Sequence, residues 1–232
     1  KEDISYFFYF LMNEGGTIAG VEDAFLYFND IGGRTFDITL GQFQVADMMF
    51  KRELRPTFED YLIYQIKPGQ TKADLTYDRG IILNYLLPSE TDLFFSVVNG
   101  NGIGSSTDGL YDSDPYKNFI ARIAQPVTSS FTAGTLGYLG KERTSGNINT
   151  FSMIGFDAAL TFDKFELLGQ YVYRHDTNPF FLAGRDSTVN THGGFMQLMY
   201  APQLNKSDWY LFLLYNNVRS DLGELKHQSV AG

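Results

Sequence analysis

The chain contains no cysteine, a single tryptophan and no long uncharged hydrophobic run. A membrane-spanning helix needs roughly 18 consecutive apolar residues, and no segment approaches that length, so a bundle of membrane helices is excluded. The absence of Cys-x-x-Cys-His excludes covalent attachment of haem through that motif. A chain without cysteine is compatible with the periplasm or the outer membrane, and also with other compartments.

Basic residues are scarce as well, with 18 Lys and Arg against 27 Asp and Glu and a net charge of -9. This balance makes nucleic acid a poor candidate partner, because the phosphate backbone would be repelled. The hydrophobic fraction of 44% is compatible with a soluble β protein and with a membrane barrel, whose hydrophobicity is hidden in alternation. Twenty-one Phe and 15 Tyr suit the aromatic girdles of a membrane barrel, although a sandwich core also uses such rings.

Two neighbouring segments, 151–162 and 165–174, alternate between apolar and polar residues at every step. In the first, Phe156 and Leu160 fall on one face and Asp157 falls on the other. In the second, aromatic rings share one face and charged or amide side chains share the opposite face. The segments are close enough in sequence to form a tight hairpin. A period of two over about ten residues is typical of a strand that crosses a bilayer.

Similar patterns recur along the chain, and helical periodicity is essentially missing, so we predict an all-β protein. The predicted fold is an antiparallel transmembrane β-barrel with about twelve visible strands, at 4–13, 18–29, 35–45, 57–67, 73–86, 92–99, 117–125, 130–139, 149–161, 164–174, 191–201 and 208–219. No linker divides the chain, so residues 1–232 form one predicted domain. Because no signal peptide precedes Lys1 and no terminal aromatic strand precedes Gly232, we expect the barrel to be incomplete at both ends.

The predicted connections sort by length. Short connections are expected at 87–91, 126–129, 162–163 and 202–207, and longer ones, rich in Gly, Asp, Ser and Asn, at 100–116, 140–148 and 175–190. Short and long alternate, as expected when turns face the periplasm and loops face outside. This sorting favours a barrel over the alternative of a soluble β-sandwich that acts as a binding module.

Segment 46–56 disrupts that rule, because the strand count places it on the short-turn side. Either a strand has been miscounted before it or the segment folds into the lumen. Its basic cluster, Lys51, Arg52 and Arg55, can bind an anion or line a constriction, since Arg matches phosphate and carboxylate geometry. The alternative is that these cations pair with the acidic residues beside them, among them Glu59.

Charged side chains on the strands must point toward water or toward partners inside the barrel, because charge in hydrocarbon is costly. Further polar candidates for the lumen wall are Asp37, Thr39, Tyr61, Gln65, Asp92, Ser96 and Asn118. The predicted channel-lining residues are Lys51, Arg52, Arg55, Glu59, Lys67, Arg79, Arg122, Asp157, Glu166, Gln170 and Arg174. They are interpreted either as a solvated wall of mixed ion pairs or as a charge-selective constriction. The alternation of its strand places Arg79 on the face toward lipid, and a bulge at Gly80 would turn its side chain inward. Arg79 is interpreted either as part of a ligand site or as a structural partner of Asp78.

Catalytic and metal chemistry have little support in the sequence. His175, His192 and His227 are predicted to lie in loops or at strand ends without metal-ligand spacing. The acidic residues of loop 100–116 do not follow the twelve-residue calcium-loop pattern, and no nucleophile-elbow motif is present. We therefore expect no enzyme activity, no metal and no cofactor.

Gly41-Gln42-Phe43-Gln44-Val45, the Lys51-Arg52-Glu53 region and Tyr77-Asp78-Arg79-Gly80-Ile81 together resemble the phosphate-selective porin O and P family. The resemblance covers mainly residues 36–86. It implies a sixteen-stranded outer-membrane channel, usually trimeric, that passes anions by means of lumenal Arg and Lys. This chain departs from that pattern in its strand count and its negative charge.

The sequence thus predicts an outer-membrane porin of a Gram-negative-type bacterium, a water-filled channel for passive diffusion of small hydrophilic solutes or ions. Its expected partners are outer-membrane lipid and a homotrimer. The alternative function is a structural barrel that sheathes or anchors a partner, such as a multihaem cytochrome of an electron conduit or another periplasmic protein.

Overall fold

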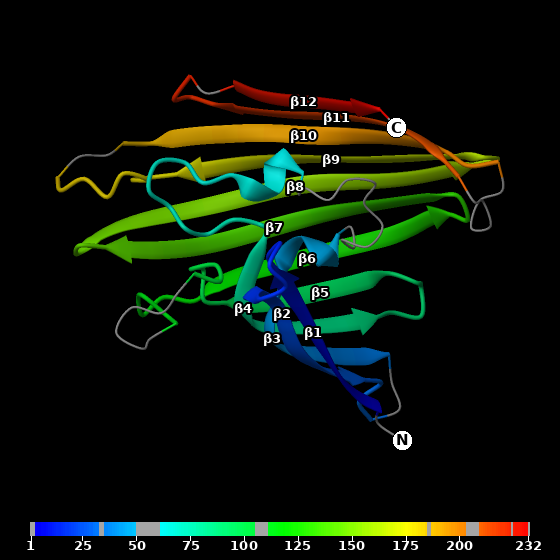
Figure 1. Cartoon of the computed structure of the whole chain (residues 1–232), viewed down its shortest axis with the longest axis horizontal. Helices are drawn as coiled ribbons and strands as arrows, with labels where there is room; N and C mark the ends of the chain where they lie inside the picture. Colours follow the sequence, from blue (N-terminus) through cyan, green and yellow to red (C-terminus); the bar gives the residue numbers. More distant parts are fainter. Residues whose placement is uncertain are drawn as a thin grey trace.

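The structure is a computed structural model that describes residues 3–32, 35–49, 61–104, 111–184, 187–202, 209–223 and 225–231. It shows a single antiparallel sheet in which twelve strands follow one another in sequence order (Figure 1). The strands are β1 (Asp3–Met12), β2 (Ile18–Asn29), β3 (Phe36–Gln44), β4 (Tyr77–Leu86), β5 (Asp92–Val98), β6 (Asn118–Thr128), β7 (Phe131–Thr144), β8 (Asn147–Phe162), β9 (Phe165–Asp176), β10 (Val189–Tyr200), β11 (Leu211–Ser220) and β12 (Leu225–Ala231). The prediction of an all-β antiparallel fold is confirmed.

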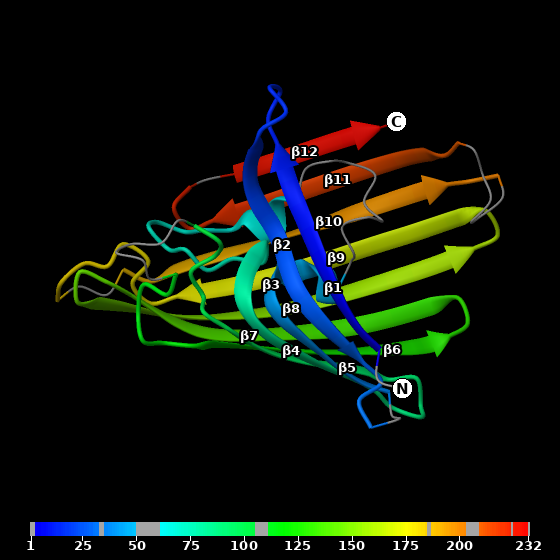
Figure 2. The same ribbon diagram turned by 60° about the horizontal axis from the view of Figure 1, so that its bottom comes forward.

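The sheet is strongly curled, so that β1 to β4 run across the direction of β8 to β12 (Figure 2). Such curling follows from the right-handed twist that accumulates from strand to strand. Within the described residues, β1 pairs only with β2 and β12 only with β11, so the sheet is not closed into a barrel. No helix in the described part of the chain is long and apolar enough to cross a membrane.

The two faces of the sheet differ, because the convex face exposes large apolar side chains and the concave face buries polar and charged side chains together with apolar ones such as Ile120 and Phe151. On β8, Ile154 and Phe156 are 48% and 56% exposed on the convex face. Their neighbours Met153 and Asp157 are 4% and 7% exposed on the concave face. The alternation predicted for 151–162 is therefore confirmed. Large apolar side chains lie outside and charged ones inside, which is the reverse of a soluble protein.

Aromatic rings form a row along the convex face at the end of the sheet where β8 turns into β9. Phe162 and Phe165 stack with their ring centroids 5.3 Å apart, and Phe165 lies 5.1 Å from Tyr200. Tyr200 in turn lies 6.2 Å from Trp209. Strand pairing places these residues side by side, because Phe165 is the register partner of both Phe162 and Tyr200.

A row of polar residues crosses the same face near the opposite end of the strands. Ser152 is paired with His175, and His192 with Arg219. On β8 the polar row and the aromatic row are separated by the apolar residues between Ser152 and Phe162. A separation of ten residues spans about 33 Å along a strand, or about 25 Å of height when the strand is tilted by about 40°. We call the surface between the two rows the apolar band.

The strand prediction contains one wrong element and one omission. Part of the predicted strand 57–67 lies within the described residues, where it forms the 3-10 helix η3 (Leu62–Gln65) instead. The strand β12 (Leu225–Ala231) was missed. Without the false strand, the strand count no longer places the connection between β3 and β4 on the short-turn side. This connection lies at the same end of the sheet as the long connections 99–117 and 177–188.

The predicted loop 140–148 is also wrong, because β7 and β8 continue into a two-residue hairpin turn at Ser145 and Gly146. Both turn residues have positive φ angles, 50° and 84°, which is the geometry that tight hairpins require. The polar composition of this stretch reflects a hairpin that extends past the apolar band. Loop length alone therefore sorts the two ends of the sheet incorrectly at this position.

The connection between β3 and β4 folds onto the concave face. We call its described residues, 45–49 and 61–76, the inner segment; it contains η1 (Val45–Met48) and η3. Its backbone closes on itself through hydrogen bonds from Val45 N to Thr76 O and from Ala46 N to Leu75 O. Tyr61, Ile63 and Tyr64 are each at most 1% exposed, so they belong to the core rather than to a two-faced wall strand. η3 packs against β10 and β11, in the part of the sheet over which Figure 1 draws it. The false strand 57–67 follows segment 46–56, so a strand miscounted before that segment does not explain its place. Of the described residues of this segment, Met48 lines the concave face of β2 to β5.

Candidate functional site

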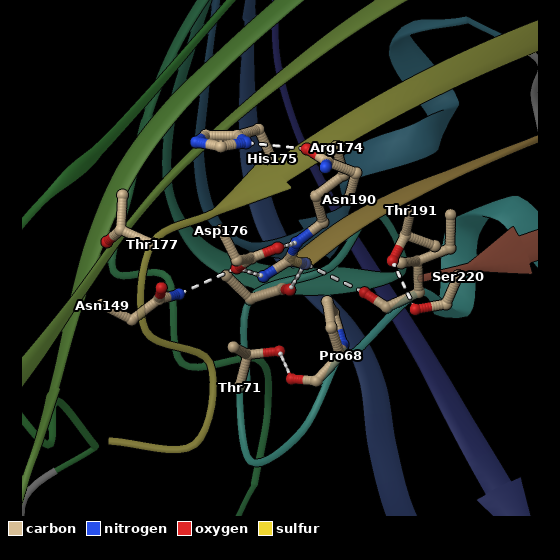
Figure 3. A network of polar contacts seen from close by, with 12 residues as sticks. Pro68, Thr71, Asn149, Arg174, His175, Asp176, Thr177, Asn190, Thr191 and Ser220 are labelled. Atoms are coloured by element: carbon tan, nitrogen blue, oxygen red, sulfur yellow. Dashed lines mark hydrogen bonds and ion pairs between the residues drawn. The ribbon is translucent and has the colours of Figure 1, made fainter. Parts of the chain in front are cut away.

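Arg174 is fully buried and fastens the inner segment to the concave wall (Figure 3). Its guanidinium donates to both carboxylate oxygens of Asp176, with N–O distances of 2.7 and 2.9 Å. It also donates to the backbone carbonyls of Ile66 at 2.9 Å and Ala73 at 2.6 Å. The ring of Phe151 lies 4.7 Å from the guanidinium carbon. A bidentate ion pair that also satisfies two carbonyls meets the requirements for burying a charge.

The wall contributes a second anchor next to Arg174. Glu142 on β7 accepts hydrogen bonds from the backbone N–H groups of Lys72, at 3.0 Å, and Ala73. Asn149 donates to Asp176 at 2.8 Å and accepts from the backbone of Asn178 at 2.9 Å. The inner segment is therefore held by polar groups from β7 and β9, and Asn149 of β8 supports them through Asp176. These bonds satisfy backbone groups of Ile66, Lys72 and Ala73.

Aromatic contacts hold η3 against β10. Tyr61 stacks on Phe195 with ring centroids 3.7 Å apart, and Tyr64 meets the same ring edge-on at 6.3 Å. The hydroxyl of Tyr61 donates to Oε1 of Gln197 at 2.6 Å. Ring packing and a buried hydrogen bond thus fix η3 and the neighbouring Tyr61 against β10.

Asp74 forms an ion pair within the inner segment. Its carboxylate is 2.8 Å from Nζ of Lys67 and accepts two hydrogen bonds from Thr76, at 2.9 and 2.7 Å. Lys67 remains half exposed and lines two small hollows. Burial raises the pKa of the Asp74 carboxyl above its usual range, and the Lys67 ammonium and the Thr76 donors lower it only partly.

We predict that stability relative to an Asp74→Asn variant depends on pH. A carboxyl whose pKa is raised by folding binds its proton more tightly in the folded state, so wild type gains stability as pH falls through the raised pKa. The gain is at most about 1.4 kcal/mol per pH unit and ends at the unfolded pKa of about 3.9. Denaturant unfolding of both proteins between pH 8 and pH 4 measures it. A difference in unfolding free energy that is constant over this range would contradict the prediction.

A second ion pair lies on the concave face away from the inner segment. Arg122 on β6 donates to Asp157 on β8 at 2.6 and 3.2 Å, and both side chains are buried. Gly134, on β7 between these two strands, leaves room for the ion pair because it has no side chain. A Cβ at this position would lie 2.6 Å from the Asp157 carboxylate. The guanidinium carbon of Arg122 lies 5.9 Å from the ring centroid of Phe94.

A hollow of about 470 Å³ lies on the concave face of β2 to β5, and we call it the β2–β5 hollow. It is lined by aromatic rings, which include Phe25 and Phe94, and by polar groups, which include Asn84 and Asp92. A space of this size is large enough for a small solute. The concave face is thus filled by the inner segment over β7 to β10 and hollow over β2 to β5.

Several predicted lining residues lie on the concave face. Arg122, Asp157, Gln170 and Arg174 are buried there, and Glu166 shares their face nearer the aromatic row. Gln170 contacts the sulfur of a methionine of the inner segment. The predicted residues that fall outside the described residues are Lys51, Arg52, Arg55 and Glu59.

Arg79 does not line the concave face, and the bulge expected at Gly80 is absent from a register that runs without a shift. Its guanidinium donates to Gln42 at 2.9 Å and to the carbonyl of Ile103 at 3.2 Å. Tyr111 covers it, with the ring centroid 4.5 Å from the guanidinium carbon. Arg79 therefore holds the 99–117 connection against the rim, which is a structural role.

The expected pair between Asp78 and Arg79 takes another form. The Asp78 carboxylate accepts hydrogen bonds from the backbone N–H groups of Arg79, at 2.7 Å, and Gly100, at 2.8 Å, rather than from the guanidinium.

The neighbouring glycines serve close strand packing. Gly41 has a φ of 141° and pairs with Gly80, and a Cβ at Gly41 would overlap the carbonyl oxygen of Ala24.

The anchors Glu142 and Asp176 were missed because both fell in predicted loops. Asp176 lies two residues after Arg174, and a period of two places both on one face once β9 is extended. Glu142 lies in the β7 extension that was interpreted as the loop 140–148. The available signal was the period of two: if it is continued past the apolar band, it extends β7 and β9 and assigns Glu142 and Asp176 to the concave face.

The histidines and the acidic loop carry no site in the described residues. His175, His192 and His227 lie within β9, β10 and β12 rather than in loops. No group of three His, Asp or Glu side chains in the described ranges is arranged to hold a metal ion. Asp112 is bonded to Asn101 and Lys117, whereas Asp108 lies outside the described ranges.

Comparisons with family models and with curated protein sequences assign no function to this arrangement. No protein-family model matches the chain. No curated protein sequence matches it either, so the resemblance to the porin O and P family stays a prediction that rests on residues 36–86.

Proposed function

We propose that the chain forms the wall of an outer-membrane β-barrel of a Gram-negative-type bacterium, a channel for passive diffusion of small hydrophilic solutes or ions. The observation that carries the proposal is the apolar band, bounded by an aromatic row and a polar row about 25 Å apart. In water such an exposed apolar surface is unfavourable, and in a bilayer it is solvated by lipid chains.

The concave face supports a polar interior. The ion pairs Arg122–Asp157 and Arg174–Asp176 are both directed away from the apolar band. The inner segment would narrow the lumen over β7 to β10, where Arg174 and Asp176 are fully buried. We place the proposed permeation path along β2 to β5, next to the β2–β5 hollow.

Adjacent isoleucines on β4 provide a matched test, since the chain has no cysteine of its own. Ile82 lines the β2–β5 hollow, whereas Ile81 lies on the opposite face and is 43% exposed. In planar bilayers, we expect a charged methanethiosulfonate reagent to modify an Ile82→Cys variant and to reduce its conductance. The Ile81→Cys variant should be unreactive and should conduct as wild type does, because lipid excludes the reagent.

Absence of conductance steps from reconstituted wild-type protein would count against the channel. Reaction of the Ile81→Cys variant with the reagent in lipid vesicles would count against the membrane orientation. Absence of conductance together with an unreactive Ile81→Cys variant would favour the alternative, a barrel that sheathes or anchors a periplasmic protein or a multihaem cytochrome. The packing of the inner segment on the wall, around Arg174, favours that alternative as a second candidate.

The resemblance to the porin O and P family adds a sixteen-stranded trimer with anion selectivity to this proposal. Further strands would complete the barrel between the free edges of β1 and β12. Light scattering in detergent tests the homotrimer, and reversal potentials in a salt gradient test the selectivity. The proposal assigns the chain no catalytic step, no cofactor and no nucleic-acid partner.

A further inference from the structure

The β2–β5 hollow combines aromatic rings with carboxylate side chains. The rings of Phe25, Phe43 and Phe94 line it, and Tyr27 lies on the same wall. Aromatic faces carry a negative electrostatic potential and attract cations within about 6 Å. The Phe94 ring already has such a neighbour, because the guanidinium of Arg122 lies 5.9 Å from its centroid.

Two carboxylates line the hollow, those of Asp23 and Asp92, and Asp37 lies beside it as the register partner of Asn84. Asp92 lines the hollow and accepts no hydrogen bond from the described residues, and its Oδ1 atom is buried. Asp37 accepts hydrogen bonds from the Tyr27 hydroxyl and from the backbone of Asp30, each at 2.9 Å. Neither Asp92 nor Asp37 forms an ion pair within the described part of the chain, so the Asp92 carboxylate is open to pair with a cation that enters the hollow.

The neighbouring cation, Arg122, attracts the Asp92 carboxylate but forms its ion pair elsewhere. Arg122 is the register partner of Phe94, but both of its bonds to a carboxylate go to Asp157. Asn84 lies opposite both Asp37 and Phe94 in the register, and its buried Oδ1 also lacks a donor. Acceptors without donors therefore border the hollow, and they suit a ligand that brings N–H groups and positive charge.

We propose that the β2–β5 hollow binds a small organic cation, an ammonium group attached to an apolar body. The apolar body would lie among Phe25, Phe43 and Ile82, and the ammonium group would face Asp92 and the Phe94 ring. A volume of about 470 Å³ accommodates a molecule the size of an aromatic amine. The site goes beyond the proposed channel, because binding does not require conduction.

Isothermal titration calorimetry of the full chain in detergent tests the site with three compounds of one shape. 2-Phenylethylamine is a cation, 2-phenylethanol is neutral and phenylacetate is an anion. We expect the cation to bind at least about tenfold more tightly than the alcohol, and phenylacetate not to bind. Equal binding of all three compounds, or no binding of the amine, would overturn the proposal.

Two variants remove one negative charge each. Asp92→Asn should weaken the binding of 2-phenylethylamine about tenfold and leave that of 2-phenylethanol unchanged. Asp163→Asn, in the β8–β9 turn, is the matched control; its φ of 50° is one that asparagine tolerates, and its binding should equal that of wild type.

Heat-modifiable migration establishes that each variant is folded. Unchanged amine binding by folded Asp92→Asn would overturn the proposal, and so would equal losses in both variants. Amine binding by a protein that does not conduct would remove the channel and leave this site standing. Conduction without amine binding would do the reverse.

Discussion

Replacing Arg174 with methionine is expected to lower the free energy of unfolding by about 3–5 kcal/mol and to release the inner segment from the wall. The substitution leaves the Asp176 carboxylate buried, with Asn149 as its one side-chain donor among the described residues. It also deprives the carbonyls of Ile66 and Ala73 of their donor. Removing one partner of a buried pair costs more than the pair contributes, because the remaining charge stays out of water.

Hydrogen exchange separates local release from a general loss of stability. We expect faster exchange at the amides of Tyr64 and Leu75, whose bonds to Tyr61 and Tyr64 carbonyls hold the inner segment together. Amides of the β7–β8 ladder should gain less, because their exchange is accelerated only by the loss of global stability. If the inner segment narrows a channel, the same variant should show larger conductance steps.

Arg219→Met is the matched control, since Arg219 is exposed on the convex face of β11 and should cost at most about 0.5 kcal/mol. The double variant Arg174→Met with Asp176→Leu removes both charges. It should regain most of the lost stability but still exchange rapidly in the inner segment, because the two carbonyls remain without a donor. Unchanged exchange in the inner segment of Arg174→Met would show that the aromatic contacts of Tyr61 suffice to hold it.

The wall of the sheet was predictable because each strand carries its own signal. In 151–162 a period of two assigns every side chain to a face without knowledge of its partners, and the structure follows that assignment from Met153 to Phe162. The hairpin at Ser145 and Gly146 was not predicted, because the strand ends beside it lack such a signal. Beyond the apolar band both faces carry polar side chains, so the contrast between apolar and polar residues disappears from the sequence although the strand and its period of two continue.

The inner segment was not predictable in the same way, because its residues acquire their environment from the wall around them. Tyr61, Ile63 and Tyr64 are buried on all sides by contacts with β10 and β11, and a local pattern of apolar residues fits a strand equally well. The position of Arg122 and Asp157 on the polar side of their strands followed from parity, whereas their pairing required the register across β7. The faces were thus accessible from sequence, and the partners were not.

An arginine on the apolar band should distinguish a membrane wall from a soluble sheet. Phe156 lies on the convex face of β8 between the polar and aromatic rows and is 56% exposed. In lipid vesicles, Phe156→Arg should lower the free energy of unfolding by about 2–4 kcal/mol, the cost of a cation near the middle of a bilayer. Denaturant titrations of protein folded into vesicles measure this free energy.

Position on one strand provides the control. Ser152 shares the strand and face of Phe156 but lies in the polar row, so Ser152→Arg should cost only about 0–1 kcal/mol. Phe156→Leu keeps the surface apolar and removes the ring from its partner Tyr171, which separates lost contacts from the cost of charge. On a soluble sheet both arginine variants would face water and their costs would agree within about 0.5 kcal/mol. A cost that depends on depth along β8 is a property that only a bilayer imposes on this surface.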